Sequence, residues 1–336
     1  MKAQQKRTKD ESKPGIRQDI SLAQGNGTRG NTKKWPLGMQ PETLKLIPDA
    51  SLRSKIMPAI PHATLPSGTQ MPSLGLGTWK MGENARTAEQ EVESLKRGLD
   101  LGMTLIDTAE MYGEGGAEII TGRAMEGRRD EIFLVSKVYP FNASYQGVID
   151  ACEASLRRLK TDRLDLYLLH WRGEHDLEET VAGFETLRRS GKIREWGVSN
   201  FDVEDMHDLM DVEDGKNCAA NQVLYNLSRR GIEYDLLPWC QKRGIPIMAY
   251  SPIEQGRILR NAELIRIAKA YQATPAQIAL AFVMRSPNTI AIPKSSNPHR
   301  VEENAGAIGL TISGEDWAAL DKVFPPPLRK QPLEML

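Results

Sequence analysis

Short apolar runs alternate with amphipathic stretches along the chain from about residue 60 onward. The runs have the length of buried strands, and the stretches between them repeat apolar residues at helical spacing, as Val148, Cys152, Leu156 and Leu159 do. The runs end near Thr78, Asp107, Lys137, His170, Ser199, Gln222, Tyr250 and Pro293. Successive ends lie 23 to 43 residues apart, the length of one strand with its helix. Eight such units predict an α/β protein with a (β/α)8 (TIM) barrel.

Turn and capping residues agree with the predicted boundaries of strands and helices. Ser67-Gly68, within ATLPSGTQMPSL, predicts the turn of a β-hairpin before the first barrel strand. Thr274-Pro275 and Asn297-Pro298 each predict the start of a helix, because proline fits the first helical turn. Glycines that close a helical stretch just before an apolar run are Gly102, Gly191 and Gly244.

An open doubly wound sheet is the main alternative fold. Such a sheet, when it binds a dinucleotide, usually carries G-x-G-x-x-G after its first strand. The corresponding run here, residues 75–80 (GLGTWK), lacks the third glycine. Asp107, at the end of the next strand, leads into a tyrosine and does not occupy the usual ribose-binding place. The barrel is therefore favoured.

Polar residues end most of the predicted strands. Because all strands of a barrel deliver their C-terminal ends to one mouth, we expect these residues to line one pocket. They are Thr78, Asp107, Lys137, His170, Ser199, Asn200, Gln222, Tyr250 and Ser251. Tyr112 follows Asp107 by five residues, in DTAEMYG, and is expected within reach of the same mouth.

Four of these side chains fit the reduction of a carbonyl, which needs a hydride at carbon and a proton at oxygen. Tyr112 can supply the proton if its pKa, about 10 when unperturbed, is lowered, and we expect the Lys137 ammonium to lower it. Asp107 is the expected counter-charge of Lys137, and an uncharged His170 can donate a hydrogen bond to the carbonyl oxygen. An Asp–Lys pair alone is usually only a salt bridge at the rim of a barrel. A histidine alone after a strand is usually only a hydrogen-bonded structural residue. The four together, in this order, favour a catalytic role.

The segment IPKSSNPHR predicts an anion site. Lys294, Ser295 and Arg300 flank the helix start at Asn297-Pro298, where backbone N–H groups and the helix dipole favour a phosphate. A basic helix start with a surface arginine is the plainer alternative for Arg300 alone.

Seven motifs, in order along the chain, resemble those of the aldo-keto reductases. They are DTAEMYG, LVSKVYP, LDLYLLHW, WGVSNF, NQVLYN, AYSPI and IPKSSNPHRVEEN, and the resemblance covers about residues 60–325. The residues around YLLHW and GIEYDLLPWCQ look most like the bacterial methylglyoxal-reducing branch. The resemblance implies an NADP-dependent reductase in which Tyr112 donates the proton, Lys137 and Asp107 tune it, and His170 orients the substrate.

The resemblance also implies a set of NADPH contacts. Lys294, Ser295 and Arg300 match residues that hold the 2′-phosphate, whereas Glu303 and Asn304 match residues that contact adenine. The nicotinamide end matches Ser199, Asn200 and Gln222 at the carboxamide and Tyr250 stacked on the ring. Further expected contacts are Thr78, Trp79, Ser251, Pro252 and, at the pyrophosphate, Arg257.

The substrate side is less marked. Trp79 and Trp171 adjoin strand ends and are expected to wall an apolar pocket with Tyr112 and His170, although either tryptophan could equally pack against a loop. The tail after the last helix is short, so we expect an open site that accepts small aldehydes and 2-oxoaldehydes. A slow NADP(H)-binding sensor on the same fold and an aldolase using Lys137 as a Schiff-base lysine remain alternatives.

Composition separates the first 55 residues from the rest. They hold 12 Lys and Arg against 5 Asp and Glu, and few apolar residues before Trp35. We therefore expect a disordered basic extension at 1–55, of uncertain authenticity, and a single catalytic domain at 56–336.

The remaining chain-wide features indicate a cytoplasmic enzyme. No run reaches the length of a membrane span, and the three cysteines fall within periodic elements, as reduced thiols do. The five histidines show no metal-ligand spacing, so no metal is expected. The basic extension lacks interleaved aromatic residues, so we expect no nucleic-acid partner, and by resemblance the protein is expected to be a monomer.

Overall fold

A computed structural model of the chain describes residues 58–336. Eight parallel strands form one sheet in chain order, so every neighbour in the sequence is also a neighbour in the sheet. The strands are β3 (Gly75–Gly77), β4 (Leu105–Asp107), β5 (Phe133–Val138), β6 (Leu164–Leu169), β7 (Ile193–Ser199), β8 (Asn221–Leu224), β9 (Ile247–Tyr250) and β10 (Thr289–Ala291). Parallel bridges join Leu74 to Ala291 and Gly77 to Lys294, which brings the first strand beside the last. The predicted (β/α)8 barrel is confirmed.

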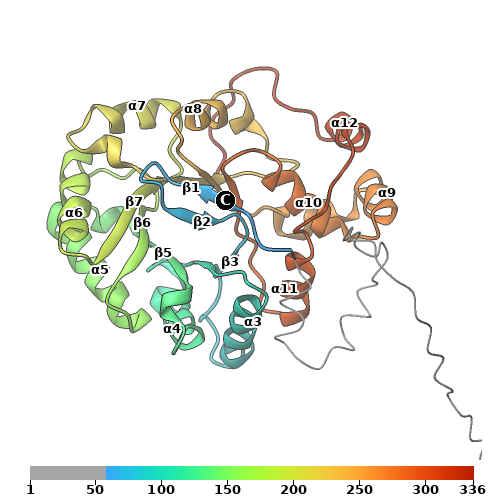
Figure 1. The fold of residues 1–336 in the computed structure, drawn as a ribbon. Coiled ribbons are helices and arrows are strands. Elements are labelled where there is room, and N and C mark those ends of the chain that lie inside the picture. The colour runs from blue at the N-terminus through green and yellow to red at the C-terminus, as the bar shows by residue number, and fades with distance from the viewer. Residues whose placement is uncertain (1–57) are drawn as a thin grey trace, which may run out of the picture. The chain divides into compact units, whose positions relative to one another are not determined.

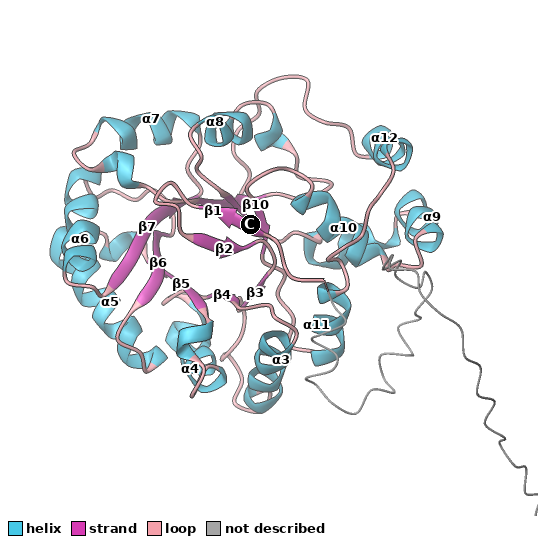
Figure 2. Cartoon of the chain, in the orientation of Figure 1, coloured by secondary structure: helices cyan, strands magenta, loops and turns pink. Residues whose placement is uncertain are grey.

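Helices surround the strands (Figures 1 and 2). They are α3 (Ala88–Asp100), α4 (Gly116–Ala124), α5 (Tyr145–Leu159), α6 (Leu177–Arg189), α7 (Val203–Asp211), α8 (Leu236–Lys242), α9 (Ala262–Ala270), α10 (Pro275–Met284), α11 (Pro298–Ala305) and α12 (Gly314–Val323). Two helices, α9 and α10, separate β9 from β10, which accounts for the longest predicted spacing. Among residues 58–336, no helix is long and apolar enough to cross a membrane.

The apolar core has two layers, as a barrel requires. The larger layer lies between strands and helices and includes Trp196, Phe184 and Tyr167. The inner layer fills the barrel with side chains from alternate strand positions, among them Leu105 and Leu166. Each strand therefore buries both faces, which explains why the strands read as continuous apolar runs rather than alternating ones.

A hairpin joins the inner layer. Strands β1 (His62–Thr64) and β2 (Gln70–Pro72) pair antiparallel, and Ala63, Leu65 and Met71 pack among the residues inside the barrel. The predicted turn is present, since Gly68 has a φ of 90° and its N–H donates to the Leu65 carbonyl. The predicted N-terminal hairpin is thus confirmed, and it contributes core as well as a turn.

Helix limits also follow the sequence. Thr274 and Gln277 form a reciprocal capping box at the start of α10, and the Asn297 side chain caps α11. The strands end within two residues of the predicted positions. The three predicted helix-closing glycines, Gly102, Gly191 and Gly244, have φ values of 85°, 75° and 69°. The predicted extension and its boundary at residue 55 lie outside the described residues.

Candidate active site

Strand ends and the loops after them line one cavity of about 410 Å³. Every barrel strand except β5 contributes a residue of its own or the one directly after it, and His170, directly after β6, is followed by Trp171 in the lining. The predicted residues on its wall are Thr78, Trp79, Asp107, Tyr112, His170, Trp171, Ser199, Asn200, Gln222, Tyr250, Ser251, Pro252, Lys294 and Arg300. The convergence expected from strand-end polarity is therefore present.

The charged centre of the cavity wall is a buried ion pair. The Lys137 ammonium contacts Asp107 Oδ1 at 2.9 Å and Oδ2 at 2.8 Å, and it donates a further hydrogen bond to the Thr108 carbonyl at 2.8 Å. Gln222 Nε2 also donates to Asp107 Oδ1, at 2.8 Å. The side chains of Lys137 and Asp107 are 0% and 3% exposed. Lys137 lies behind Asp107 and does not itself line the cavity.

Tyr112 borders the cavity beside this pair, at the start of a 3-10 turn, Tyr112–Gly115. The Lys137 ammonium lies 4.9 Å from the centre of the Tyr112 ring. Burial, and to a lesser extent the Asp107 carboxylate, raises the pKa of Tyr112 well above its usual value. The prediction that the pKa of Tyr112 is lowered is therefore wrong. Burial outweighs any effect of the ammonium, whose hydrogen bonds go to Asp107 and Thr108.

His170 faces Tyr112 across the cavity wall. Their rings lie edge to face, with centres 5.5 Å apart. Burial and the Lys137 ammonium lower the pKa of His170 well below its usual value, so the ring is neutral at pH 7. Its Nδ1 is buried and has no hydrogen-bond partner within residues 58–336. A neutral imidazole beside a neutral phenol gives the site two uncharged polar groups that can act on a carbonyl oxygen.

A hydrogen-bonded group forms the opposite wall. Tyr250 donates its hydroxyl to Asn200 Oδ1 at 2.9 Å, and Asn200 Nδ2 donates to the His170 carbonyl and to Ser199 Oγ. Ser199 Oγ in turn donates to the Gln222 carbonyl at 2.8 Å. Asn200 adopts a left-handed conformation, with a φ of 58°, which asparagine tolerates better than most residues. This group fixes its members' rotamers before any ligand arrives.

The predicted anion site lies at the end of the same cavity. Lys294 follows β10, and burial lowers its pKa. Its ammonium donates to Ser296 Oγ at 2.8 Å, while Arg300, on the first turn of α11, is exposed. Lys294 and Arg300 therefore offer two cations beside a capped helix start, whereas Asp107, Tyr112 and His170 offer the reacting groups elsewhere on the wall.

Several predicted residues stand apart from the cavity lining. Arg257 is paired with Glu254 at 2.7 Å, and Ser295 Oγ bonds to the backbone of Asn297. Glu303 and Asn304 lie on α11 beyond the lining residues, Asn304 being 4% exposed. Their roles at the cofactor stay predictions.

Sequence reasoning missed part of the lining. Met335 and Leu336 reach the cavity from the tail, although a short tail predicted an open site without such a contribution. Gln255 and Gly256 also line it, from a loop in which both have positive φ. The apolar pair Met335-Leu336 at the end of the tail was the available signal.

The cavity fits a dinucleotide that carries an additional phosphate. Its lining includes the cations Lys294 and Arg300 as well as Tyr112 and His170, and Ser251 Oγ is buried without a partner among the described residues. Residues 58–336 contain no cluster of acidic, histidine and cysteine side chains able to hold a metal ion. Fold and site together define a barrel enzyme that binds an anionic cofactor beside a proton-donating group.

Comparison with known proteins agrees with this class. The model described as "Aldo/keto reductase family" matches residues 73–324. The chain is 52% identical over 271 residues to methylglyoxal reductase YeaE of Escherichia coli strain K12, covering 79% of this chain and 95% of that protein. It is 36% identical over 257 residues to glyoxal reductase of Bacillus subtilis strain 168, covering 76% and 90%.

A solved structure is similar over nearly the whole described part. It is the aldo/keto reductase from Klebsiella pneumoniae in complex with NADP and acetate, at a TM-score of 0.81 and 50% identity. The match covers 83% of this chain and all of that one. The chain therefore belongs to the aldo/keto reductase family, and its activity is that of an NADP-dependent oxidoreductase that reduces carbonyl groups.

Proposed function

We propose that the protein reduces small aldehydes and 2-oxoaldehydes, such as methylglyoxal, to alcohols with NADPH. One observation carries the proposal: Tyr112 and His170 share a cavity with Lys294 and Arg300, so a proton donor and an anion site belong to one pocket. The substrate class is supported by the 52% identity to a methylglyoxal reductase.

NADPH, when bound, supplies the hydride. Lys294, Ser295 and Arg300 would hold its 2′-phosphate, because two cations and a capped helix start favour a dianion. Arg257 would contact the pyrophosphate, and Glu303 and Asn304 the adenine. At the other end, Ser199, Asn200 and Gln222 would bind the carboxamide, with Tyr250 against the ring. Thr78, Trp79, Ser251 and Pro252 would complete the contacts.

Tyr112 donates the proton that completes the reduction. Its raised pKa keeps the phenol protonated at pH 7, so the proton is present when the carbonyl oxygen gains negative charge. The Asp107–Lys137 pair places a cation 4.9 Å from the ring, where it stabilises negative charge left on the phenol after transfer.

His170 orients the carbonyl. Because its ring is neutral, one nitrogen can donate a hydrogen bond to the carbonyl oxygen. The neutral ring does not replace Tyr112 as the acid. The Asn200 contact to the His170 carbonyl fixes the backbone that carries the ring. Hydrogen bonds from both residues to one oxygen would strengthen as that oxygen becomes an alkoxide.

Apolar walls limit the substrate. Trp79, Trp171, Met335 and Leu336 border the cavity and offer it apolar side chains. We further propose that the protein acts as a monomer in the cytoplasm, which three buried, unpaired cysteines among the described residues support.

The test is NADPH oxidation with methylglyoxal, an aromatic aldehyde and a sugar aldehyde. Turnover should be fastest with the small aldehydes. Tight NADPH binding without turnover of any of the three would overturn the proposal and favour a nucleotide-binding sensor. Trapping of a substrate on Lys137 by borohydride would favour aldolase chemistry instead.

A further inference from the structure

We propose that Arg229 is a positioning residue that couples the affinity for NADPH to the place of the tail that borders the substrate site. The cofactor loop is residues 251–260, after β9, and the tail is residues 325–336. The inference rests on the proposed function, in particular on Arg257 as the pyrophosphate contact. Arg229 itself does not line the cavity.

Glu254 is the buried centre of the cofactor loop. Its side chain is 4% exposed, and it accepts hydrogen bonds from Asn226 at 2.8 Å and from Arg257 at 2.7 Å. Arg229 contacts the same Oε1 as Arg257, at a longer 3.4 Å. Two guanidinium groups therefore share one buried oxygen, and the nearer is the one proposed to bind the cofactor.

The loop around Glu254 depends on these contacts. Ser251, Glu254 and Gln255 all have positive φ, of 50°, 49° and 52°, a conformation that is costly for residues other than glycine. Asn226 Nδ2 bridges the Ser251 carbonyl and Glu254 Oε2, and thus holds the turn closed. Since Ser251 and Gln255 line the cavity, the charge on Glu254 bears directly on the shape of the cofactor side.

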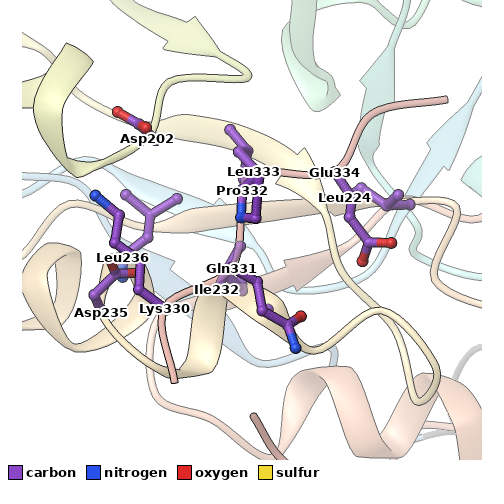
Figure 3. Close-up of a pocket in the computed structure, with 11 residues that line it drawn as sticks. Asp202, Leu224, Ile232, Asp235, Leu236, Lys330, Gln331, Pro332, Leu333 and Glu334 are labelled. Carbon is purple, nitrogen blue, oxygen red and sulfur yellow. The ribbon is translucent and has the colours of Figure 1, made fainter. Parts of the chain in front are cut away.

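The second partner of Arg229 lies on the tail. Arg229 Nη1 forms an ion pair with Glu334, which directly precedes the cavity-lining Met335 and Leu336. Figure 3 shows Lys330 to Glu334 running past Leu224 and Leu236, with Glu334 and Lys330 at opposite ends of that stretch. A separate ion pair, between Lys330 and Glu204, tethers the other end.

Arg229 therefore contacts two carboxylates, that of Glu254 on the loop and that of Glu334 on the tail. When Glu334 holds Arg229, Glu254 must rely on Arg257, which is then less free to turn toward a phosphate. When Arg229 moves closer to Glu254, it can replace Arg257 there. A change at Glu334 is thus expected to alter NADPH affinity although that residue is not a proposed cofactor contact.

The test is the Kd for NADPH, measured by quenching of tryptophan fluorescence in the full chain. Glu334→Gln releases Arg229 toward Glu254, so NADPH should bind roughly threefold tighter, the scale of a partly exposed ion pair. Arg229→Met leaves Glu254 to Arg257 alone, so binding should weaken by a similar factor. In the Arg229→Met background, Glu334→Gln should leave the Kd for NADPH unchanged.

Lys330→Gln is the matched control. It loosens the tail at its other tether without touching Arg229, and NADPH affinity should stay that of the wild type. If Lys330→Gln tightens binding as Glu334→Gln does, or if Glu334→Gln has no effect, the inference is overturned. Should Arg229→Met fail to fold, Arg229→Lys, whose single ammonium cannot contact both carboxylates with separate nitrogens, replaces it as the background.

The two proposals can fail separately. If the wild-type protein binds NADPH and reduces methylglyoxal but Glu334→Gln leaves the Kd unchanged, only the coupling through Arg229 is refuted. If the wild-type protein does not bind NADPH, the proposed function fails and the coupling fails with it.

Discussion

Replacing Lys137 by methionine should destabilise the barrel far more than an ordinary substitution. The ammonium contacts both oxygens of Asp107 and the Thr108 carbonyl at 2.8–2.9 Å, in a site where the two charged side chains are 0% and 3% exposed. Methionine fills the space but leaves the carboxylate with Gln222 as its remaining hydrogen-bond donor within residues 58–336. Breaking a buried pair in this way costs about 3–5 kcal/mol.

Removing both charges should cost less than removing one. In Asp107→Asn combined with Lys137→Met, no buried charge is left unpaired, and the loss falls to that of a few hydrogen bonds, about 1–3 kcal/mol. Asp107→Asn alone leaves the Lys137 ammonium without its counter-charge, so its loss of stability should be similar to that of Lys137→Met. The double variant is then more stable than either single variant.

Urea unfolding, followed by circular dichroism and by tryptophan fluorescence, measures these differences. Agreement of the two probes is needed before a free energy of unfolding is assigned. A loss below about 1 kcal/mol for Lys137→Met would mean that water or a rearranged partner reaches the carboxylate. A double variant that loses the sum of the two single losses would refute the pairing itself.

Two further predictions concern the anion site and the histidine. Replacing Lys294 and Arg300 together by methionine should narrow the preference for NADPH over NADH, measured as the ratio of kcat/KM values, and an unchanged ratio would place the phosphate elsewhere. The pKa of His170 is lowered in the folded chain, so the unfolded chain takes up this proton first as the pH falls below about 6.5, and stability drops from there downward. His170→Gln should flatten that drop between pH 7 and pH 5 in urea unfolding, and an identical slope would contradict the neutral buried ring.

Much of the fold could be predicted because barrel strands have a simple signature. Each is largely buried, and several carry a polar residue at or next to their C-terminal end, as β4 does at Asp107 and β7 at Ser199. The strand order follows the chain order, so the convergence of these residues needed no long-range information. Lys294 and Arg300 were predicted separately, from the helix start at Asn297-Pro298, and they line the same cavity.

What the sequence could not provide depends on contacts between distant segments. Glu254 lies in the loop after β9, but its partner Arg229 follows β8, and Glu334 lies about a hundred residues further along. The spacing of apolar residues does not indicate which distant charged residues form ion pairs. The direction of the Tyr112 pKa was predicted wrongly for a related reason, since it is raised by burial and by the Asp107 carboxylate, which only the folded chain brings around the phenol.

Proton donation by Tyr112 is the central step of the proposed reaction. Its most direct test is a single turnover of NADPH with saturating methylglyoxal by the wild-type protein and by Tyr112→Phe, with the Kd for NADPH measured on both. We predict that the phenylalanine variant binds NADPH within about twofold of the wild type yet loses reduction by a factor of at least about a hundred. A phenylalanine variant that still oxidises NADPH at the wild-type rate would show that the proton comes from another group.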